Sequence, residues 1–330
     1  MLQAELTLPR TFTITKDAAV PIPDPNEVLV KVHQVGICGS DLHAYHGKHP
    51  FISCPVVPGH EFVGIVDQCG DGSQELVGQR VTALPSLTCG HCPQCREGRF
   101  NICQSLRVIG CQAPGAFAEY VLVPKDRIFP LPEALDWDLG TLVEPLAVAV
   151  HAVRRVRRIS GAHTLVLGCG TIGLMTLYVL KNYGAGSITA VDLQDSRLEL
   201  AGKLGADKLQ KPDEAIAGPI HTSFECVGIE ATMNQAILST EKGGEIGVLG
   251  VFEEDVPVKM GLVQDKELTL LGTLMYTDAD YEEAIRLLST NPSHMKELIT
   301  HRYALTDVDD AFQHLNRAPQ ETLKVMLTVE

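Results

Sequence analysis

A glycine-rich turn between two apolar runs constrains the fold of this chain more than any other feature of its sequence. The letters TLVL precede Gly168-Cys169-Gly170-Thr171-Ile172-Gly173, an apolar helical stretch follows, and a second apolar run ends at Asp192. A strand, a helix and a second strand joined in this way form a parallel pair, because the helix carries the chain back to the same end of the sheet. The segment therefore predicts a parallel sheet.

The residues after this unit continue its alternation. The apolar runs SFECVG, EIGVLG and LTLLGT have the composition of strands, and stretches near 230–241 and 278–288 have helical periodicity, as does 139–158 before the turn. Strands that alternate with helices predict a doubly wound α/β domain. With 330 residues the chain exceeds the size at which a single core usually stops growing, so we expect two domains.

The first part of the chain has a different pattern. Between about 27 and 123 it contains short, Val-rich, alternating runs that each close on Gly, Pro, Asp or Asn: EVLVKVHQVG, HEFVGIVDQCG, GQRVTAL and GAFAEYVLVP. Short alternating runs separated by turn residues predict a β-rich domain. The final letters TLKVMLTVE predict one more strand.

Charge and hydropathy exclude several partners. The chain carries 41 acidic and 27 basic residues, a net charge of −14 that repels nucleic acid and anionic membranes. Its one basic cluster, Arg154, Arg155, Arg157 and Arg158, ends a helical stretch, where cations complement the helix dipole. The longest apolar run is too short to span a bilayer, and the N-terminal residues lack the apolar core of a signal peptide. We expect a cytoplasmic protein without a membrane or nucleic-acid partner.

Four of the ten cysteines crowd into one loop. Cys89, Cys92, Cys95 and Cys103 have the spacing C-x2-C-x2-C-x7-C, and two-residue gaps let neighbouring thiolates face one tetrahedral ion. Four thiolates leave no open position, which predicts a structural rather than a catalytic zinc. The alternatives are free surface thiols or an iron–sulfur cluster. His91 lies in the same loop and is expected at the surface.

A second candidate metal centre combines three residue types. Cys38 lies in VGICGSDLHAYHG, and His60 with Glu61 lies in VPGHEFVGIVDQCG. A thiolate, an imidazole and a carboxylate from two loops suit a zinc that keeps one position open for substrate. The spacing alone does not establish this centre, because a lone cysteine and an adjacent His–Glu pair are common as ordinary residues.

These motifs carry a family resemblance. Gly59-His60-Glu61-x2-Gly64-x5-Gly70 resembles the zinc signature of the medium-chain zinc alcohol dehydrogenases, and Cys38-Gly39-Ser40-Asp41 resembles the first-ligand loop of that family. The four-cysteine spacing and the glycine turn follow in the family's order, so the resemblance spans most of the chain. It implies an enzyme with a GroES-like β-rich catalytic domain and a Rossmann nucleotide-binding domain.

The resemblance also implies where these domains lie. The catalytic domain is expected to comprise 1–148 and 275–330, with the structural-zinc lobe at 86–104, and the nucleotide-binding domain 149–274. The C-terminal segment would thus return to the first domain. Members of this branch form homotetramers or dimers, which implies a homo-oligomer.

Three further residues take catalytic roles from the resemblance. Glu144 in LVEPLAVAVHAV matches a glutamate of sorbitol dehydrogenases, which implies a fourth zinc ligand beside Glu61 or a group that holds the zinc-bound water. Ser40 and His43 resemble the family's relay, which passes the substrate proton to solvent. Alternatively, Glu144 is an acid that only stabilises a helix N-terminus. Ser40 and His43 could likewise only form hydrogen bonds with the loop backbone.

The glycine turn predicts a dinucleotide cofactor. Asp192 ends the strand after the turn, where a carboxylate can accept hydrogen bonds from the adenosine ribose and repels the extra phosphate of NADP, so NAD is expected. Arg197 could instead pair with that phosphate, although in NAD-linked sorbitol dehydrogenases an arginine here packs near adenine. The turn residues expected at the pyrophosphate are Gly168, Gly170, Thr171, Ile172 and Gly173.

Later strand ends join the cofactor site through the resemblance alone. In the family, the backbone at the matching positions contacts the nicotinamide end of the cofactor. From sequence alone these residues are ends of core strands. They are Val227, Leu249, Gly250, Val251, Thr273, Leu274 and Met275.

The branch of the family that the sequence resembles narrows the range of expected substrates. Gly39, Glu144 and the EPLAVAVHA run resemble sorbitol, threonine and sugar-acid dehydrogenases, but Ala44 and Met275 stand where sorbitol dehydrogenases have a tyrosine and an arginine. Several pieces look like L-galactonate-type dehydrogenases. The resemblance implies NAD-linked oxidation of a secondary alcohol on a polyol or sugar acid. The alternatives are an L-threonine 3-dehydrogenase and, in a different class, a zinc-free reductase or a non-catalytic nucleotide-binding protein.

Overall fold

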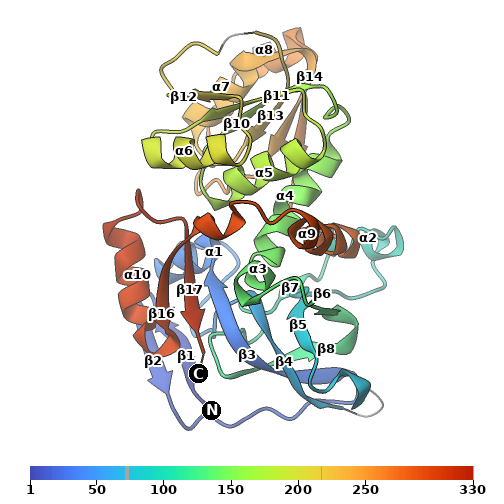
Figure 1. The fold of residues 1–330 in the computed structure, drawn as a ribbon, viewed down its shortest axis with the longest axis vertical. Coiled ribbons are helices and arrows are strands. Elements are labelled where there is room, and N and C mark those ends of the chain that lie inside the picture. The colour runs from blue at the N-terminus through green and yellow to red at the C-terminus, as the bar shows by residue number, and fades with distance from the viewer. Residues whose placement is uncertain (71–73, 217, 330) are drawn as a thin grey trace. The chain divides into compact units, whose positions relative to one another are not determined.

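The computed structural model describes residues 1–70, 74–216 and 218–329 (Figure 1). They divide into two compact units. The first comprises Met1–Glu144, Leu288–Pro292 and Leu298–Glu330, and the second comprises Pro145–Leu287 and Ser293–Glu297. The domain limits expected from the sequence stay a prediction, and they differ from these units at 145–148, 275–287 and 293–297.

The first unit is built on one large, mostly antiparallel sheet. Its order is β16-β17-β3-β4-β5-β9, and β8 pairs with β3 beside this path. Only β16 and β17 are parallel neighbours. The strands are β3 (Glu27–Ile37), β4 (Glu61–Cys69), β5 (Arg80–Ala83), β8 (Tyr120–Pro124), β9 (Ile128–Pro130), β16 (Ile299–Ala304) and β17 (Lys324–Thr328).

Smaller elements complete this unit. Two further strand pairs are β1 (Gln3–Leu8) with β2 (Thr11–Thr15), and β6 (Ser86–Leu87) with β7 (Arg107–Val108). Its helices are α1 (Gly39–Tyr45), α2 (Pro93–Arg96), α3 (Trp137–Thr141) and α10 (Val308–Arg317).

Aromatic rings join the C-terminal segment to the rest of the first unit. Phe312 of α10 lies with its ring centroid 5.0 Å from that of Phe12 and 4.8 Å from that of Tyr45. All three side chains are buried, and aromatic pairs at this separation stabilise a core beyond the area that they bury. The last residues of the chain therefore fold with the first ones, as β17 also shows by pairing with β3.

The second unit contains a six-stranded parallel sheet. Its order is β12-β11-β10-β13-β14-β15, which corresponds to 3-2-1-4-5-6, the order of a Rossmann sheet. The strands are β10 (His163–Leu167), β11 (Ser187–Val191), β12 (Lys208–Gln210), β13 (Ile220–Glu225), β14 (Thr240–Val248) and β15 (Thr269–Gly272).

Helices cover both faces of this sheet (Figure 1). α5 (Thr171–Asn182) and α6 (Asp195–Lys203) pack together on one face, and α7 (Glu230–Ser239) and α8 (Met260–Asp265) pack together on the other. α9 (Asp278–Thr290) follows β15. The doubly wound α/β fold predicted from the sequence is confirmed.

The prediction of one continuous helix over 139–158 is wrong. The structure has two helices there, α3 (Trp137–Thr141) and α4 (Val143–Arg155), with Leu142 between them. Pro145 has no backbone N–H to donate to the carbonyl of Thr141, and its ring would clash with that carbonyl in a continuous helix. The proline is tolerated because it lies in the first turn of α4, where backbone N–H groups have no partner within the helix.

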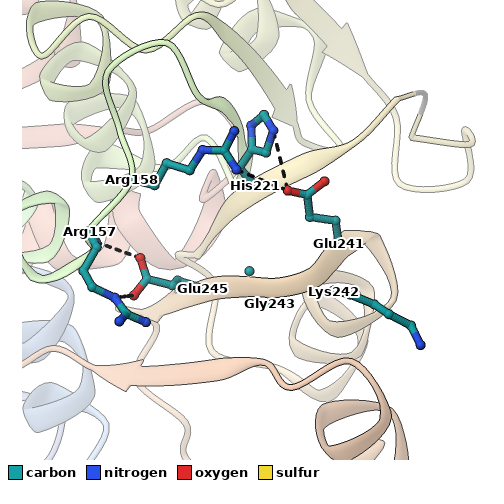
Figure 2. A pocket seen from close by; sticks show the side chains of 8 residues that line it. Arg157, Arg158, His221, Glu241, Lys242, Gly243 and Glu245 are labelled. Carbon is teal, nitrogen blue, oxygen red and sulfur yellow. Dashed lines mark hydrogen bonds and ion pairs between the residues drawn. The ribbon is translucent and has the colours of Figure 1, made fainter.

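A polar pocket lies at the amino edge of the parallel sheet (Figure 2). His221 lies near the start of β13, Glu241 lies near the start of β14, and Glu245 of β14 stands opposite Thr222 of β13. The glutamates already pair with arginines: Glu245 Oε1 lies 2.9 Å from Arg157 Nε, and Glu241 Oε1 lies 3.5 Å from Arg158 Nη1. Two arginines of the basic cluster, Arg157 and Arg158, therefore form ion pairs at the edge of the sheet opposite the glycine turn.

A buried ionic network fixes α9 within the second unit. Asp280 lies 2.7 Å from His151 Nδ1 and 3.0 Å from Arg154 Nη1, and it also accepts hydrogen bonds from the backbone and hydroxyl of Thr277. Burial alone would raise the pKa of Asp280, but the hydrogen bonds from His151 and Thr277 outweigh it and hold the pKa at about 2.

Among the described residues, every helix is too short or too polar to cross a bilayer.

Asp280→Asn should destabilise the protein at neutral pH. Removing one partner of a buried ionic network leaves the other charges uncompensated, at a cost of about 3 kcal/mol. Because the folded pKa lies below the usual value, the stabilisation is complete above about pH 5 and is lost as the pH falls towards 2. Urea unfolding of both proteins at pH 7 and pH 3.5 should therefore show a difference that shrinks on acidification. A difference independent of pH would contradict this account.

Candidate active site

The sheet of the first unit brings Cys38 to His60 and Glu61. Cys38 directly follows β3, and Glu61 begins β4, the antiparallel neighbour in which Glu61 stands opposite Gly36. One ligand atom from each of Cys38, His60 and Glu61 lies within 4.8 Å of the other two. Among the described residues this is one of two groups of metal-ligating side chains so close together. A gap of twenty-two positions in sequence thus closes into one cluster.

The carboxylate of Asp41 lies behind the imidazole of His60. Its Oδ1 lies 3.8 Å from His60 Nδ1, and its Oδ2 accepts a hydrogen bond of 2.9 Å from the backbone of Cys38. A carboxylate behind the imidazole is the usual arrangement at a metal-bound histidine, and it leaves Nε2 for the metal. Ser40 Oγ lies on that side, 3.5 Å from Nε2. Asp41 was not foreseen as a partner of His60 from the sequence, although a carboxylate three residues after a candidate ligand was a signal for it.

The electrostatics of this cluster favour a cation. Burial alone lowers the pKa of His60, but the negative charges of Asp41 and Cys38 outweigh it, so that the pKa lies well above its usual value. His60 Nδ1 and Asp41 Oδ1 are both buried without a hydrogen-bond partner. A dication held by the thiolate, the imidazole and the carboxylate would be stabilised by the same charges, so the residues fit a zinc site.

Lys324 pairs with Glu61 and was not foreseen from the sequence. Its Nζ lies 2.7 Å and 2.6 Å from the two carboxylate oxygens and donates a third hydrogen bond, of 3.1 Å, to the carbonyl of Ile37. Burial alone lowers the pKa of Lys324, yet the charges of Glu61 and Cys38 raise it above the usual value. No spacing rule links residue 324 to residue 61, because only the pairing of β17 with β3 brings them together.

The other predicted catalytic residues lie in this unit. His43 is half-buried on α1, and its charge, with that of His60, contributes to a lowered pKa of His49, whose main cause is burial. Glu144 is 5% exposed in the first turn of α4 and acts electrostatically on Lys324. It lies outside the close cluster of three ligand atoms, so its part at the metal stays a prediction.

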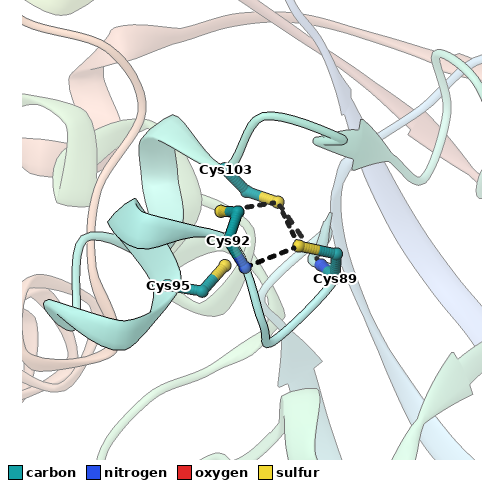
Figure 3. A group of neighbouring side chains, drawn as sticks. All are labelled: Cys89, Cys92, Cys95 and Cys103. Atoms are coloured by element: carbon teal, nitrogen blue, oxygen red, sulfur yellow. Dashed lines mark hydrogen bonds between the residues drawn. The ribbon is translucent and has the colours of Figure 1, made fainter.

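The four cysteines form a second cluster (Figure 3). The Sγ atom of Cys103 lies 3.5 Å from that of Cys89 and 4.0 Å from that of Cys92. Four sulfurs at the usual zinc–sulfur distance would stand about 3.8 Å apart at the corners of a tetrahedron. Hydrogen bonds from the backbone of Gln104 and Cys95 lower the pKa of Cys92 to about 6, whereas burial and the neighbouring thiols raise the pKa of Cys95 to about 12. The geometry therefore fits the predicted structural zinc.

His91 takes no part in this cluster. Its side chain is exposed, and its Nδ1 lies 2.7 Å from the carbonyl oxygen of Cys89.

The glycine turn follows β10 and opens α5. Gly170 is the N-cap of α5, and Gly168 has a φ of +88°, a conformation that favours glycine. A Cβ on Gly173 would stand 1.8 Å from the carbonyl oxygen of Gly168, so the helix can approach the turn only without one. Asp192 accepts hydrogen bonds of 2.7 Å from the backbone of Cys169 and 2.8 Å from that of Gln194.

The remaining cofactor residues share the same edge of the sheet. Val227, Leu249–Val251 and Thr273–Met275 follow the carboxyl ends of β13, β14 and β15, and the carboxyl ends of parallel strands meet at one edge, where open α/β sheets bind ligands. Arg197 is half-buried on α6, which follows β11. Met275 has a φ of +50°, unusual for a residue with a side chain.

Glu225 supports two of these strand ends and was also missed. Its Oε1 accepts hydrogen bonds from the backbone of Val227 and Gly228, both 2.9 Å, and its own carbonyl accepts from Leu249 and Gly250. The side chain is fully buried at the end of β13. The letters SFECVG indicated a strand but no role for its glutamate.

Comparison with known proteins identifies the family. The Alcohol dehydrogenase GroES-like domain matches residues 24–133, and the Zinc-binding dehydrogenase family matches residues 171–290. Sorbitol dehydrogenase of Bacillus subtilis (strain 168) is 32% identical over 94% of this chain and 93% of its own length. The chain belongs to the zinc-dependent medium-chain dehydrogenases. It is thus an oxidoreductase of the zinc alcohol dehydrogenase type, and the relatives place it in the polyol branch.

Further similar proteins bear on substrate and cofactor. L-galactonate-5-dehydrogenase of Escherichia coli (strain K12) is 31% identical over 96% of this chain and 95% of its own. A zinc-binding dehydrogenase from Sinorhizobium meliloti 1021 bound to NADP has a TM-score of 0.92 at 33% identity, over 99% and 98% of the two chains. An alcohol dehydrogenase from E. coli CFT073 with NADH has a TM-score of 0.92 at 30% identity, over 99% of each. The GroES-like and Rossmann fold class predicted from the sequence is confirmed.

Cys89→Ser should remove one of two zinc ions per chain and destabilise the protein. Because a structural zinc contributes folding free energy directly, its unfolding temperature should fall by roughly 10 °C. Elemental analysis and thermal unfolding measure both effects, and Cys69→Ser, a half-buried cysteine outside both clusters, is the matched control. Two zinc ions and unchanged stability in the Cys89 variant would argue against a structural site.

Proposed function

We propose that this protein oxidises a secondary alcohol on a polyol or sugar acid to the ketone, with NAD as the hydride acceptor. The observation that carries the proposal is the convergence of Cys38, His60 and Glu61 within 4.8 Å, on a chain of the zinc-dependent medium-chain dehydrogenase family. We further propose that Cys89, Cys92, Cys95 and Cys103 hold a second, structural zinc, and that the protein is a homo-oligomer, a tetramer or a dimer.

The metal and the cofactor each supply one part of the chemistry. Zinc would supply a Lewis acid that lowers the pKa of the substrate hydroxyl, and NAD would supply the acceptor for the hydride from the neighbouring carbon. The Asp41 carboxylate lies 3.8 Å from His60 Nδ1, and Ser40 Oγ lies 3.5 Å from His60 Nε2. A hydroxyl both accepts and donates a hydrogen bond, so Ser40 can take the substrate proton and pass it on towards His43, which is half-buried.

Asp192 supports NAD over NADP. The two backbone hydrogen bonds to its oxygens fix a carboxylate at the end of β11, and a carboxylate there repels the additional phosphate of NADP. The alternative cofactor is NADP, which the similar structure from Sinorhizobium meliloti contains. In that case Arg197 of this protein would pair with the additional phosphate.

The relatives' names support a polyhydroxylated substrate. They include a sorbitol dehydrogenase, an L-idonate 5-dehydrogenase and an L-galactonate-5-dehydrogenase. These names favour a polyol or sugar acid over L-threonine. Ala44 and Met275, which stand where sorbitol dehydrogenases have larger polar side chains, favour a sugar acid or a polyol other than sorbitol.

Cys38→Ser should abolish turnover while NAD binding persists. Losing the metal removes the Lewis acid, and we expect kcat to fall by at least about a thousandfold. The assay should screen polyols, aldonates and L-threonine with NAD, and tryptophan or cofactor fluorescence should measure NADH binding. Near-normal rates in the variant, or activity of the native protein on L-threonine alone, would refute the proposal.

Asp192→Ala should weaken NAD more than NADP. The loss of a charge-assisted hydrogen bond to the ribose costs about 2 kcal/mol, or roughly thirtyfold in the KM for NAD. Initial rates with both cofactors, in native protein and variant, measure the change in preference. A native preference for NADP would overturn the assignment of the cofactor.

A further inference from the structure

The Lys324–Glu61 pair crosses the central strand of the first unit's sheet. At its end β3 pairs with β4 on one side and with β17 on the other, so Glu61 and Lys324 come from opposite sides of that strand. Glu61 stands opposite Gly36, Met326 stands opposite Gly36 on the other side, and side chains two residues apart along a strand share a face. Lys324 therefore lies on the same face of the sheet as Glu61 and Gly36.

Gly36 opens the path by which the two side chains meet. A Cβ on Gly36 would stand 2.2 Å from Glu61 Oε2 and 3.3 Å from Glu61 Cβ, so a side chain there would occupy the place of the carboxylate. The backbone of Gly36 needs no left-handed conformation. The glycine is therefore explained by the approach of Glu61, and not by a turn.

The pair is fully buried and its hydrogen bonds are complete on the side of the lysine. Lys324 is 3% exposed and Glu61 is 1% exposed. The three ammonium protons have three acceptors, namely both carboxylate oxygens and the carbonyl of Ile37. Two oxygens offer about four lone pairs, so the ammonium leaves the carboxylate able to bind a second cation.

That second cation has a defined place. The same carboxylate contributes a ligand atom to the cluster with Cys38 and His60. A carboxylate on a flexible side chain can turn away from a metal unless something holds it, and hydrogen-bond partners of ligands commonly contribute ten- to hundredfold to metal affinity.

We propose that Lys324 is the positioning residue of the catalytic metal centre, where its ammonium holds the Glu61 carboxylate with one oxygen directed to the metal bound by Cys38 and His60. The inference rests on the proposed function, because it assumes a metal in that cluster. Lys324 touches neither substrate nor cofactor in this account and acts only through Glu61.

A purely structural ion pair is the competing account. Arg157 and Glu245 form such a pair in the second unit, with a buried carboxylate that contributes to no metal cluster among the described residues. Glu245→Gln is therefore a matched control, because it breaks a buried carboxylate's ion pair without touching a ligand.

The experiment measures zinc affinity by competition with a chromophoric chelator. Cys38→Ser, which should lose the catalytic zinc alone, assigns the two ions. Lys324→Met should weaken that site about ten- to hundredfold and leave the four-cysteine site unchanged. Lys324→Arg keeps the charge and should restore most of the affinity, and Glu245→Gln should change neither site. In protein loaded with Co²⁺, the Met variant should also alter the visible spectrum of the catalytic site.

Gly36→Ala covers the case in which the Lys324 variant fails to fold. Its methyl group should displace the Glu61 carboxylate while Lys324 remains, and it should weaken the same site. Unchanged or tighter catalytic-site binding in folded Lys324→Met, or in Gly36→Ala if the former does not fold, would overturn the inference alone. A native protein that binds only the zinc of the four cysteines would overturn the proposed function, and this inference with it.

Discussion

The pairing of β3 with β4 is the constraint on which the candidate metal centre depends. It places the end of one strand beside the start of the next, so that Cys38 meets His60 and Glu61. The register is specific, because a shift by one residue would turn Glu61 to the opposite face of the sheet. β17 pairs with β3 on the side opposite β4, and it brings Lys324 across Gly36 to the Glu61 carboxylate.

The charges around the centre follow from that geometry. Asp41 and Glu61 bring negative charge into a buried site, and a buried charge is costly unless it is paired. Lys324 pairs with Glu61, and Asp41 faces His60. These partners explain why the buried acids are tolerated and why the site favours a further cation.

The second unit applies a different constraint. Its strands are parallel, so the loops that follow their carboxyl ends all lie at the same edge of the sheet. Close backbone approach decides the details: Gly173 lies against the carbonyl of Gly168, and Glu225 joins the loops after β13 and β14. At the amino edge Arg157 and Arg158, which follow α4, pair with Glu245 and Glu241.

The sequence by itself determined whatever depends on local pattern. The glycine turn between two strands required a parallel sheet, and the short spacings within C-x2-C-x2-C placed the thiols together, because neighbours in the chain are neighbours in space. Even so, periodicity missed the break at Leu142, which the missing N–H of Pro145 explains.

Tertiary structure alone decided the contacts between distant segments. Periodicity carries no information on which strand pairs with which, so the sequence could not place Lys324 beside Glu61, Glu225 beneath the loop at Gly250, or Asp280 between His151 and Arg154. Even the cluster of Cys38 with His60 and Glu61 followed in sequence only from a family resemblance, because the twenty-one residues between Cys38 and His60 can fold in many ways until β3 and β4 pair.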